Sequence, residues 1–120
     1  MNPAQESFQV NTSYSKSGAR ILSPVGPLTI RTLFDFQAAS RQESTKPVII
    51  DVSGIPYMDS AGLGSVIGVF TMCQNSNRGF AVCGLTERIR TLMAVTHVND
   101  LLPNFQTIDE ADAAVSKGAT

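Results

Sequence analysis

Two short apolar runs in the middle of the chain constrain its fold more than any other feature of the sequence. The first lies within KPVIIDVSG, residues 46–54, and the second lies within RGFAVCG, residues 78–84. Each run is too short for a typical helix and is bounded by proline or glycine, which is the pattern of a strand covered on both faces. Such strands occur in parallel sheets that helices cover, so the runs predict an α/β fold.

The segments around these two strands alternate between strand and helix patterns. The sequence predicts strands over 8–14, 19–26, 46–54 and 78–84, and a short strand within 99–108. It predicts helices over about 30–44, over about 60–76 and over 109–118, and a further helix that begins at Glu87 after a Thr86 cap. Strand and helix alternate after an initial hairpin, which indicates one layered domain around a mixed sheet. We therefore expect a single α/β domain over 8–118, with about five strands, about four helices and a flexible tail at 1–7.

The charge balance excludes two classes of partner. The formal net charge is −1 and the sequence pI is about 5.7. Nucleic-acid binders and polybasic membrane anchors need a basic excess, so neither function is expected. No run of apolar residues is long enough to span a membrane, and the first ten residues do not resemble a signal peptide. We expect a cytoplasmic protein.

The potential metal ligands are too few and too scattered for a metal centre. Cys73, Cys83 and the single histidine, His97, fit no metal-binding spacing, so no metal or other cofactor is expected. Both cysteines lie among apolar residues and are predicted to be small buried hydrophobes, with a disulfide as the less favoured alternative.

The predicted helix over 60–76 has an unusual composition. A wheel at 100° per residue places Leu63, Val66, Ile67, Phe70 and Cys73 on one face, which is the expected core side, and Ala61, Gly64, Ser65, Gly68 and Met72 on the opposite face. No charged residue occurs from Ser60 through Asn77. An uncharged face containing glycine is typical of close approach by another protein. The alternative is that the helix is sandwiched within its own domain.

The hydroxyl of Ser60, within YMDSAGLGSV, allows several interpretations. Asp59 or Ser60 is expected to cap the helix. A hydrolase elbow would need a glycine where Met58 stands, and His97 would have to lie nearby, so a catalytic serine is disfavoured. The glycine spacing in GLGSVIG does not match a dinucleotide site, and no lysine follows Gly68 as a phosphate loop requires. The remaining interpretation is a phosphorylation site, since a helix N-terminus tolerates an added phosphate.

The segment around Ser60 resembles the signature of a known family. VIIDVSGIPYMDSAGLGSVIG resembles the core signature of the STAS domain, and specifically that of bacterial anti-sigma factor antagonists. The similarity extends over most of the chain, through GPLT before the first helix, FAVCGLTERIRTLMAVTHVNDLL and the final IDEADAA.

The resemblance implies a partner-switching regulator that is not an enzyme. Ser60 matches the family's phosphorylated serine. The unphosphorylated antagonist would bind an anti-sigma factor, which is usually also a serine kinase, and so free a sigma factor; a serine phosphatase would reverse the modification. Asp59 would orient the loop or the attacking hydroxyl, Gly62 and Gly64 would permit close approach of the partner, and Ala61, Ser65 and Gly68 would line the docking face.

Two positions around the motif distinguish this chain. Many relatives carry an aspartate where this chain has Thr29, a position near the phosphorylation site and expected to contact the partner. Ala61 follows the serine, so Ser60 is the one hydroxyl at the tip of the motif. The main alternative function is a non-switching STAS scaffold, or a partner subunit of a lipid-transport ATPase. A homodimer through the same uncharged face is also open.

Overall fold

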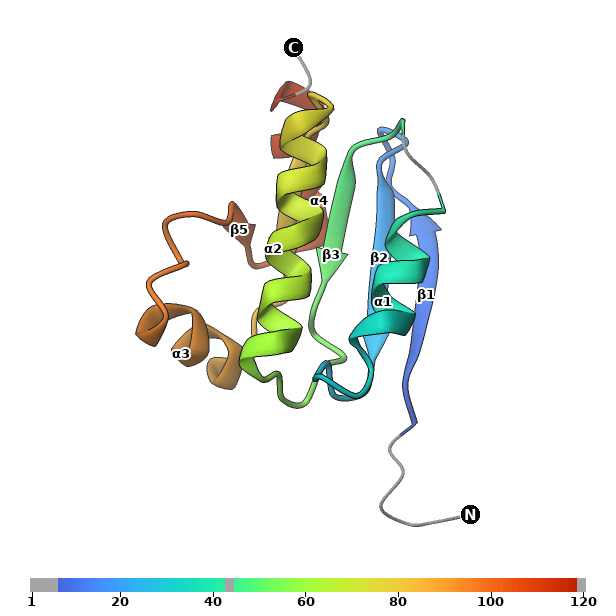
Figure 1. Ribbon diagram of the computed structural model, residues 1–120. Coiled ribbons are helices and arrows are strands. Elements are labelled where there is room, and N and C mark those ends of the chain that lie inside the picture. Colours follow the sequence, from blue (N-terminus) through green and yellow to red (C-terminus); the bar gives the residue numbers. More distant parts are fainter. Residues whose placement is uncertain (1–6, 43–44, 119–120) are drawn as a thin grey trace.

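The computed structural model describes residues 7–42 and 45–118, and in this part of the chain it contains a five-stranded sheet in the order β1-β2-β3-β4-β5 (Figure 1). β1 (Gln9–Tyr14) pairs antiparallel with β2 (Arg20–Val25). β3 (Val48–Asp51), β4 (Phe80–Cys83) and β5 (Asn104–Phe105) follow in parallel register. The predicted mixed sheet is therefore confirmed. Most of the predicted tail at 1–7 lies outside the described residues.

Three helices connect successive parallel strands. They are α1 (Leu33–Ser40), α2 (Ser60–Asn75) and α3 (Glu87–Val95), and α4 (Ile108–Gly118) follows β5. Right-handed crossovers between neighbouring parallel strands place their helices on the same face of the sheet. α4 packs on the opposite face, against β3 and β4. The molecule thus has three layers, with the sheet in the middle (Figure 1).

The buried side chains form one core on each face of the sheet. In β3, Val48 and Ile50 belong to the core beneath the connecting helices, whereas Ile49 belongs to the core beneath α4. The α4 side is built of smaller residues, with Ala19, Ala81 and Ala111 among its members. The prediction of a central strand covered on both faces is confirmed.

The half of the sheet that α4 does not cover is polar. β1 is almost entirely exposed, and the register with β2 places Gln9, Asn11 and Ser13 on the α4 side. Alternate residues of a strand point to opposite faces, so Val10 on the other side packs against the larger core. Apart from Val25, which is 42% exposed opposite Gln9, the side chains on this part of the far face are polar, so one helix on that face is sufficient.

Local hydrogen bonds set the ends of the helices. The Thr86 hydroxyl accepts the Ile89 N–H at 3.3 Å, which confirms the predicted cap of α3. At the end of α1, the buried guanidinium of Arg20 donates to the Ala39 carbonyl at 2.6 Å and to the Ser40 carbonyl at 3.5 Å. A cation at the C-terminus of a helix is favourably placed for the helix dipole.

The first helix is shorter than predicted. Thr32 Oγ1 accepts the Thr29 N–H at 3.0 Å and donates to the Pro27 carbonyl at 2.8 Å. This turn delays the start of α1 to Leu33, three residues after the expected start at residue 30, because threonine side chains compete for backbone groups.

Both cysteines are buried and free, so the disulfide alternative was wrong. Burial raises the pKa of the Cys83 thiol to about 12, and the nearby Asp51 carboxylate adds to the shift. Burial also raises the pKa of Cys73. The two thiols act as small core residues, as predicted.

Candidate functional site

The predicted site lies where the loops that follow β2 and β3 run side by side. Leu28 and Met58 form a parallel bridge between these loops. The Leu28 N–H donates to the Tyr57 carbonyl at 3.2 Å, and the Asp59 N–H donates to the Leu28 carbonyl at 3.3 Å. α1 and α2 both begin directly after this pairing, so their N-termini are held at the same end of the sheet (Figure 1).

The Asp59 carboxylate joins the two loops at the start of α2. Its Oδ1 accepts the Gly62 N–H at 2.8 Å, which makes Asp59 the N-cap of the helix. Its Oδ2 accepts the Ile30 N–H from the neighbouring loop at 3.1 Å. The prediction that Asp59 or Ser60 caps the helix is confirmed for Asp59, whose two oxygens orient both loops.

The Ser60 hydroxyl is left free by this arrangement. Ser60 is the first residue of α2, it is exposed, and its hydroxyl makes no hydrogen bond with any residue that the structure describes. No hydrogen bond joins it to His97, which is exposed beyond the end of α3. A nucleophilic serine needs a base within hydrogen-bond reach. The arrangement instead presents an accessible hydroxyl at the positive end of a helix.

Gly62 packs against the protein itself. A Cβ at this position would overlap the carbonyl oxygen of Leu28, so only glycine lets α2 approach the neighbouring loop this closely. This packing accounts for the glycine within the chain itself, and close approach of a partner at Gly62 stays a prediction.

Ser65 and Thr29 are also turned inward. Ser65 is buried on the side of α2 that faces α1, and its hydroxyl donates to the Gly62 carbonyl at 2.6 Å. Thr29 is buried, and its Oγ1 accepts the Arg31 N–H at 3.2 Å. Both side chains are therefore buried in this structure, and the predicted roles of Ser65 in the docking face and of Thr29 in partner contact stay predictions.

A narrower part of α2 remains open. Gly64 and Gly68 are exposed, and a Cβ at either position would meet nothing within 4 Å. Ala61 is half-buried beside them. The expected core face is confirmed for Leu63, which is buried, as are Val66 and Cys73, while Ile67 and Phe70 are partly buried against the same core.

Two exposed apolar side chains that sequence reasoning missed lie beside this open strip. Ile30 is 61% exposed and Phe34 is 69% exposed. The buried residues of α1 are Leu33, Phe36 and Ser40, and this helical spacing leaves Phe34 off the core stripe. That spacing was a signal in the sequence that could have identified Phe34.

Phe34 lies on the side of α1 that faces α2. Helical periodicity places it on the same side as Gln37 and Arg41, which line a shallow groove of about 110 Å³ between the two helices, together with Gly68. The α1–α2 surface is defined here as Ile30, Phe34, Ser60, Gly64 and Gly68. It combines an exposed hydroxyl with apolar side chains and open backbone.

Neither a metal centre nor a membrane-spanning helix is found in the part of the chain that the structure describes. The described residues contain no group of three or more His, Cys, Asp or Glu side chains that could hold a metal ion. None of the helices in the described ranges is both long and apolar enough to cross a membrane.

Comparison with known proteins identifies relatives of this chain in sequence and in fold. The STAS domain family model matches residues 12–111. An anti-sigma-B factor antagonist of Staphylococcus epidermidis is 31% identical over 74 residues, which are 62% of this chain and 68% of that protein. The crystal structure of an anti-sigma factor antagonist from Mycobacterium paratuberculosis superposes with a TM-score of 0.77 at 21% identity, over 95% of this chain and 97% of that one.

The same fold also occurs in a transporter. The murine anion transporter Solute Carrier 26 family member A9 superposes with a TM-score of 0.70 at 11% identity, over 94% of this chain and 22% of that one. The fold alone therefore does not distinguish an antagonist from a domain that is part of a larger protein with another function.

Proposed function

Because this chain belongs to the STAS domain family, we propose that it is an anti-sigma factor antagonist that binds an anti-sigma factor while Ser60 is unphosphorylated. The family match spans most of the chain, and the curated relative named above is itself an anti-sigma-B factor antagonist. Phosphorylation of Ser60 would release the partner, and a serine phosphatase would restore binding.

The observation that carries this proposal is the free Ser60 hydroxyl at the rim of the α1–α2 surface. It is exposed and makes no hydrogen bond with the residues that the structure describes, so a kinase could reach it without unfolding the loop. Its neighbours on the surface include Ile30 and Phe34, two large apolar side chains that are exposed. Exposed aromatic residues next to open backbone are typical anchors for a protein partner.

The electrostatics of the loop explain how a phosphate would act as a switch. A phosphoserine carries a charge of roughly −1.5 to −2 at neutral pH. The Asp59 carboxylate is held beside Ser60 by its two hydrogen bonds and cannot turn away without losing them. The added charge would thus form a concentrated negative site at the edge of an apolar interface, where its desolvation opposes binding. A cost of about 3 kcal/mol would weaken binding by roughly a hundredfold.

The proposal assigns ATP and metal chemistry to the partners. An anti-sigma factor with kinase activity would supply ATP, and the phosphatase would supply its own metal ion. In this chain Thr29 stands where many relatives carry an aspartate, and it bonds within its own turn. Its role would be to shape the loop that presents Ile30 rather than to touch the partner.

The test measures binding of the purified chain to its cognate anti-sigma factor, with Ser60→Ala, Ser60→Asp and wild type compared. We expect alanine to bind as wild type does, because the hydroxyl makes no bond in the structure, and aspartate to bind more weakly. Incubation with the partner and ATP should add one phosphate to wild type and none to Ser60→Ala, as seen by intact mass. Equal binding by all three variants and no phosphate gain would refute the switch.

Phe34→Ala gives a separate test of the surface itself. The side chain is mostly exposed, so its removal should change the free energy of unfolding by less than about 0.5 kcal/mol. Loss of an interface anchor typically costs 1 kcal/mol or more of binding, which is at least about fivefold in affinity. Unchanged affinity would move the docking site elsewhere. A partner whose affinity falls in the Phe34 variant but is the same for all Ser60 variants would favour the alternative function, a non-switching STAS scaffold.

A further inference from the structure

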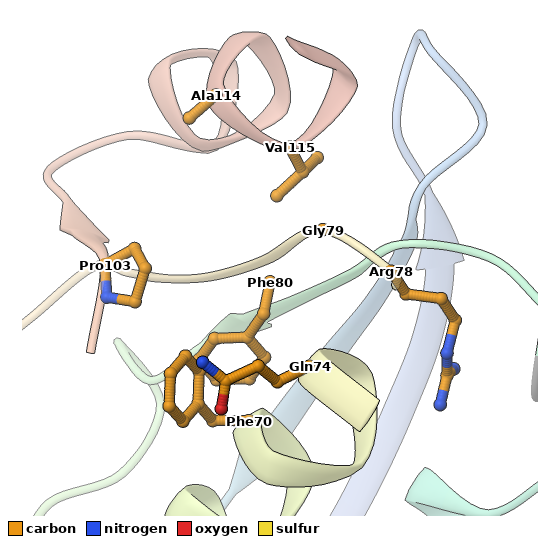
Figure 2. Close-up of a pocket in the computed structure, with 8 residues that line it drawn as sticks. All are labelled: Phe70, Gln74, Arg78, Gly79, Phe80, Pro103, Ala114 and Val115. Atoms are coloured by element: carbon orange, nitrogen blue, oxygen red, sulfur yellow. The ribbon is translucent and has the colours of Figure 1, made fainter. Parts of the chain in front are cut away.

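A second hollow lies at the far end of α2 from Ser60, along the outer edge of the sheet. It is a cavity of about 260 Å³ where the C-terminal half of α2, the start of β4, Pro103 and α4 meet. Figure 2 shows Phe70, Phe80 and Gln74 on the α2 side, Ala114 and Val115 on the α4 side, and Pro103 at one end. The cavity shares no residue with the α1–α2 surface.

The strand register leaves one residue unpaired in this cavity. β5 is only two residues long and pairs with Val82 and Cys83, so the first half of β4 has no neighbour on its outer edge. The Val82 N–H donates outward to the Pro103 carbonyl at 2.9 Å, while the Gly79 and Cys83 carbonyls accept bonds from the β3 side. Because successive residues of a strand direct their backbone groups to alternate sides, the N–H and C=O of Phe80 point outward.

These two backbone groups have no partner in the described part of the protein. The ladder with β5 begins only at Val82, and no bond to a loop or helix residue of the described part is found for the Phe80 N–H or C=O, although the residue as a whole is 8% exposed. Backbone groups in such surroundings are almost always paired. An adjacent donor and acceptor, aimed into a hollow with apolar walls, form the recognition element of a ligand site.

The edge is blocked at one end, and α4 covers one face of the strand there. Pro103 and β5 occupy the edge beyond Phe80. At Gly79 the α4 backbone lies so close that an added Cβ would be 2.7 Å from the Val115 carbonyl oxygen. An extended peptide therefore cannot continue along β4 past Pro103, and the space suits a compact molecule that pairs with Phe80.

The walls favour a flat apolar ring. Phe70 and Phe80 meet edge to face, with ring centroids 5.4 Å apart and an interplanar angle of 65°. Pro103, Ala114 and Val115 complete an apolar lining, and the Gln74 amide is the polar group at the mouth. The guanidinium of Arg78 is turned away in Figure 2 and bonds to Ser76 Oγ and the Lys46 carbonyl.

We propose that this cavity binds a small planar molecule with a lactam edge, whose adjacent N–H and C=O pair with the C=O and N–H of Phe80. Heterocycles of this kind present donor and acceptor on one side, which matches a single residue of an unpaired strand edge. The site would give the domain a small-molecule input that is separate from its α1–α2 surface.

The test titrates the isotope-labelled full chain with quinolin-2(1H)-one and follows the backbone amides by NMR. We expect a saturable downfield shift of the Phe80 amide proton, because it gains a hydrogen bond. The matched probe 1-methylquinolin-2-one lacks the N–H donor and should bind at least about tenfold more weakly. Absence of a saturable shift at Phe80, or equal affinity for the two probes, would overturn the proposal.

Matched variants locate the site. Ala114→Trp should fill the cavity and abolish binding, whereas Ala113→Trp, on the exposed side of the same helix, should leave it unchanged. Ala114→Leu repeats the test if the tryptophan variant fails to fold. Equal binding by the Ala114 and Ala113 variants would contradict the location. Tighter binding of N-acetylvaline N′-methylamide than of the quinolinone would assign the edge to an extended peptide instead.

Discussion

The packed and the open side of α2 differ in what their small residues do. On the packed side Gly62 is buried against the Leu28 loop, and Ser65 is buried toward α1. On the open side, which reaches the groove beside α1, an added Cβ at Gly64 or Gly68 would face open space. The same residue type therefore serves internal packing at one position and exposes backbone at another, two residues later. The comparison shows that a small-residue pattern on a helix cannot be assigned to a partner until the neighbouring elements are placed.

The largest effect that distinguishes the two sides should come from Gly62→Ala. The new methyl group would overlap the Leu28 carbonyl, and a backbone atom cannot rotate out of the way as a side chain can. We expect a loss of about 3 kcal/mol in the free energy of unfolding, measured by urea denaturation. A loss below about 1 kcal/mol would show that the two loops separate easily and that Gly62 is not a packing residue.

Asp59→Ala should have the next largest effect. The substitution removes the acceptor for the N–H groups of both Gly62 and Ile30, and loss of an N-cap typically costs about 1 kcal/mol. With the second bond included, we expect a loss of about 2 kcal/mol in the free energy of unfolding. Ser60→Ala is the matched control and should change it by less than about 0.5 kcal/mol. Similar losses for the two variants would mean that Ser60 shares the capping role.

Gly64→Ala and Gly68→Ala should shift stability in the opposite direction. Neither methyl group meets another atom, and alanine is favoured over glycine within a helix by about 1 kcal/mol. Each variant should unfold at a higher urea concentration and yet bind the anti-sigma factor more weakly, if a partner packs against this backbone. If the variants are more stable and bind the anti-sigma factor as tightly as wild type does, the interface is confined to the α1 side of the surface.

The reactivity of cysteine thiols should distinguish the packed side of α2 from the open side without a measurement of stability. Cys73 lies on the buried side of α2, and burial raises its pKa, so little reactive thiolate forms at neutral pH. Wild type should not react with Ellman's reagent until it unfolds, because Cys83 is buried as well. A Gly68→Cys variant should release one equivalent of chromophore at once. Rapid reaction of the wild-type protein would show that the packed side opens readily.

The features that the sequence predicted correctly depend on residues close together in the chain. The run VIID in β3 and the Thr86 cap of α3 were identified because strand length, flanking breakers and capping residues act locally. The position of Ser60 at the start of α2 followed from the same kind of evidence.

The features that it missed depend on neighbours far away in the chain. Whether Ser65 is exposed depends on where α1 packs, and whether Gly62 is open depends on the Leu28 loop. The unpaired backbone of Phe80 depends on β5 being only two residues long, which no local pattern around Phe80 could show. Tertiary packing decided each of these, and periodicity along one segment carries no information about it.

The double hydrogen bond of Asp59 has a consequence for the motions of the site. One carboxylate holds the Ile30 N–H and the Gly62 N–H together, so neither loop can open while the other stays closed without sacrificing a bond. Fluctuations of the first turn of α2 and of the segment that carries Ile30 are thereby merged into a single cooperative opening. The surface around Ser60 is presented to a partner as one preassembled unit, and the entropy of ordering it is lost on folding rather than on binding.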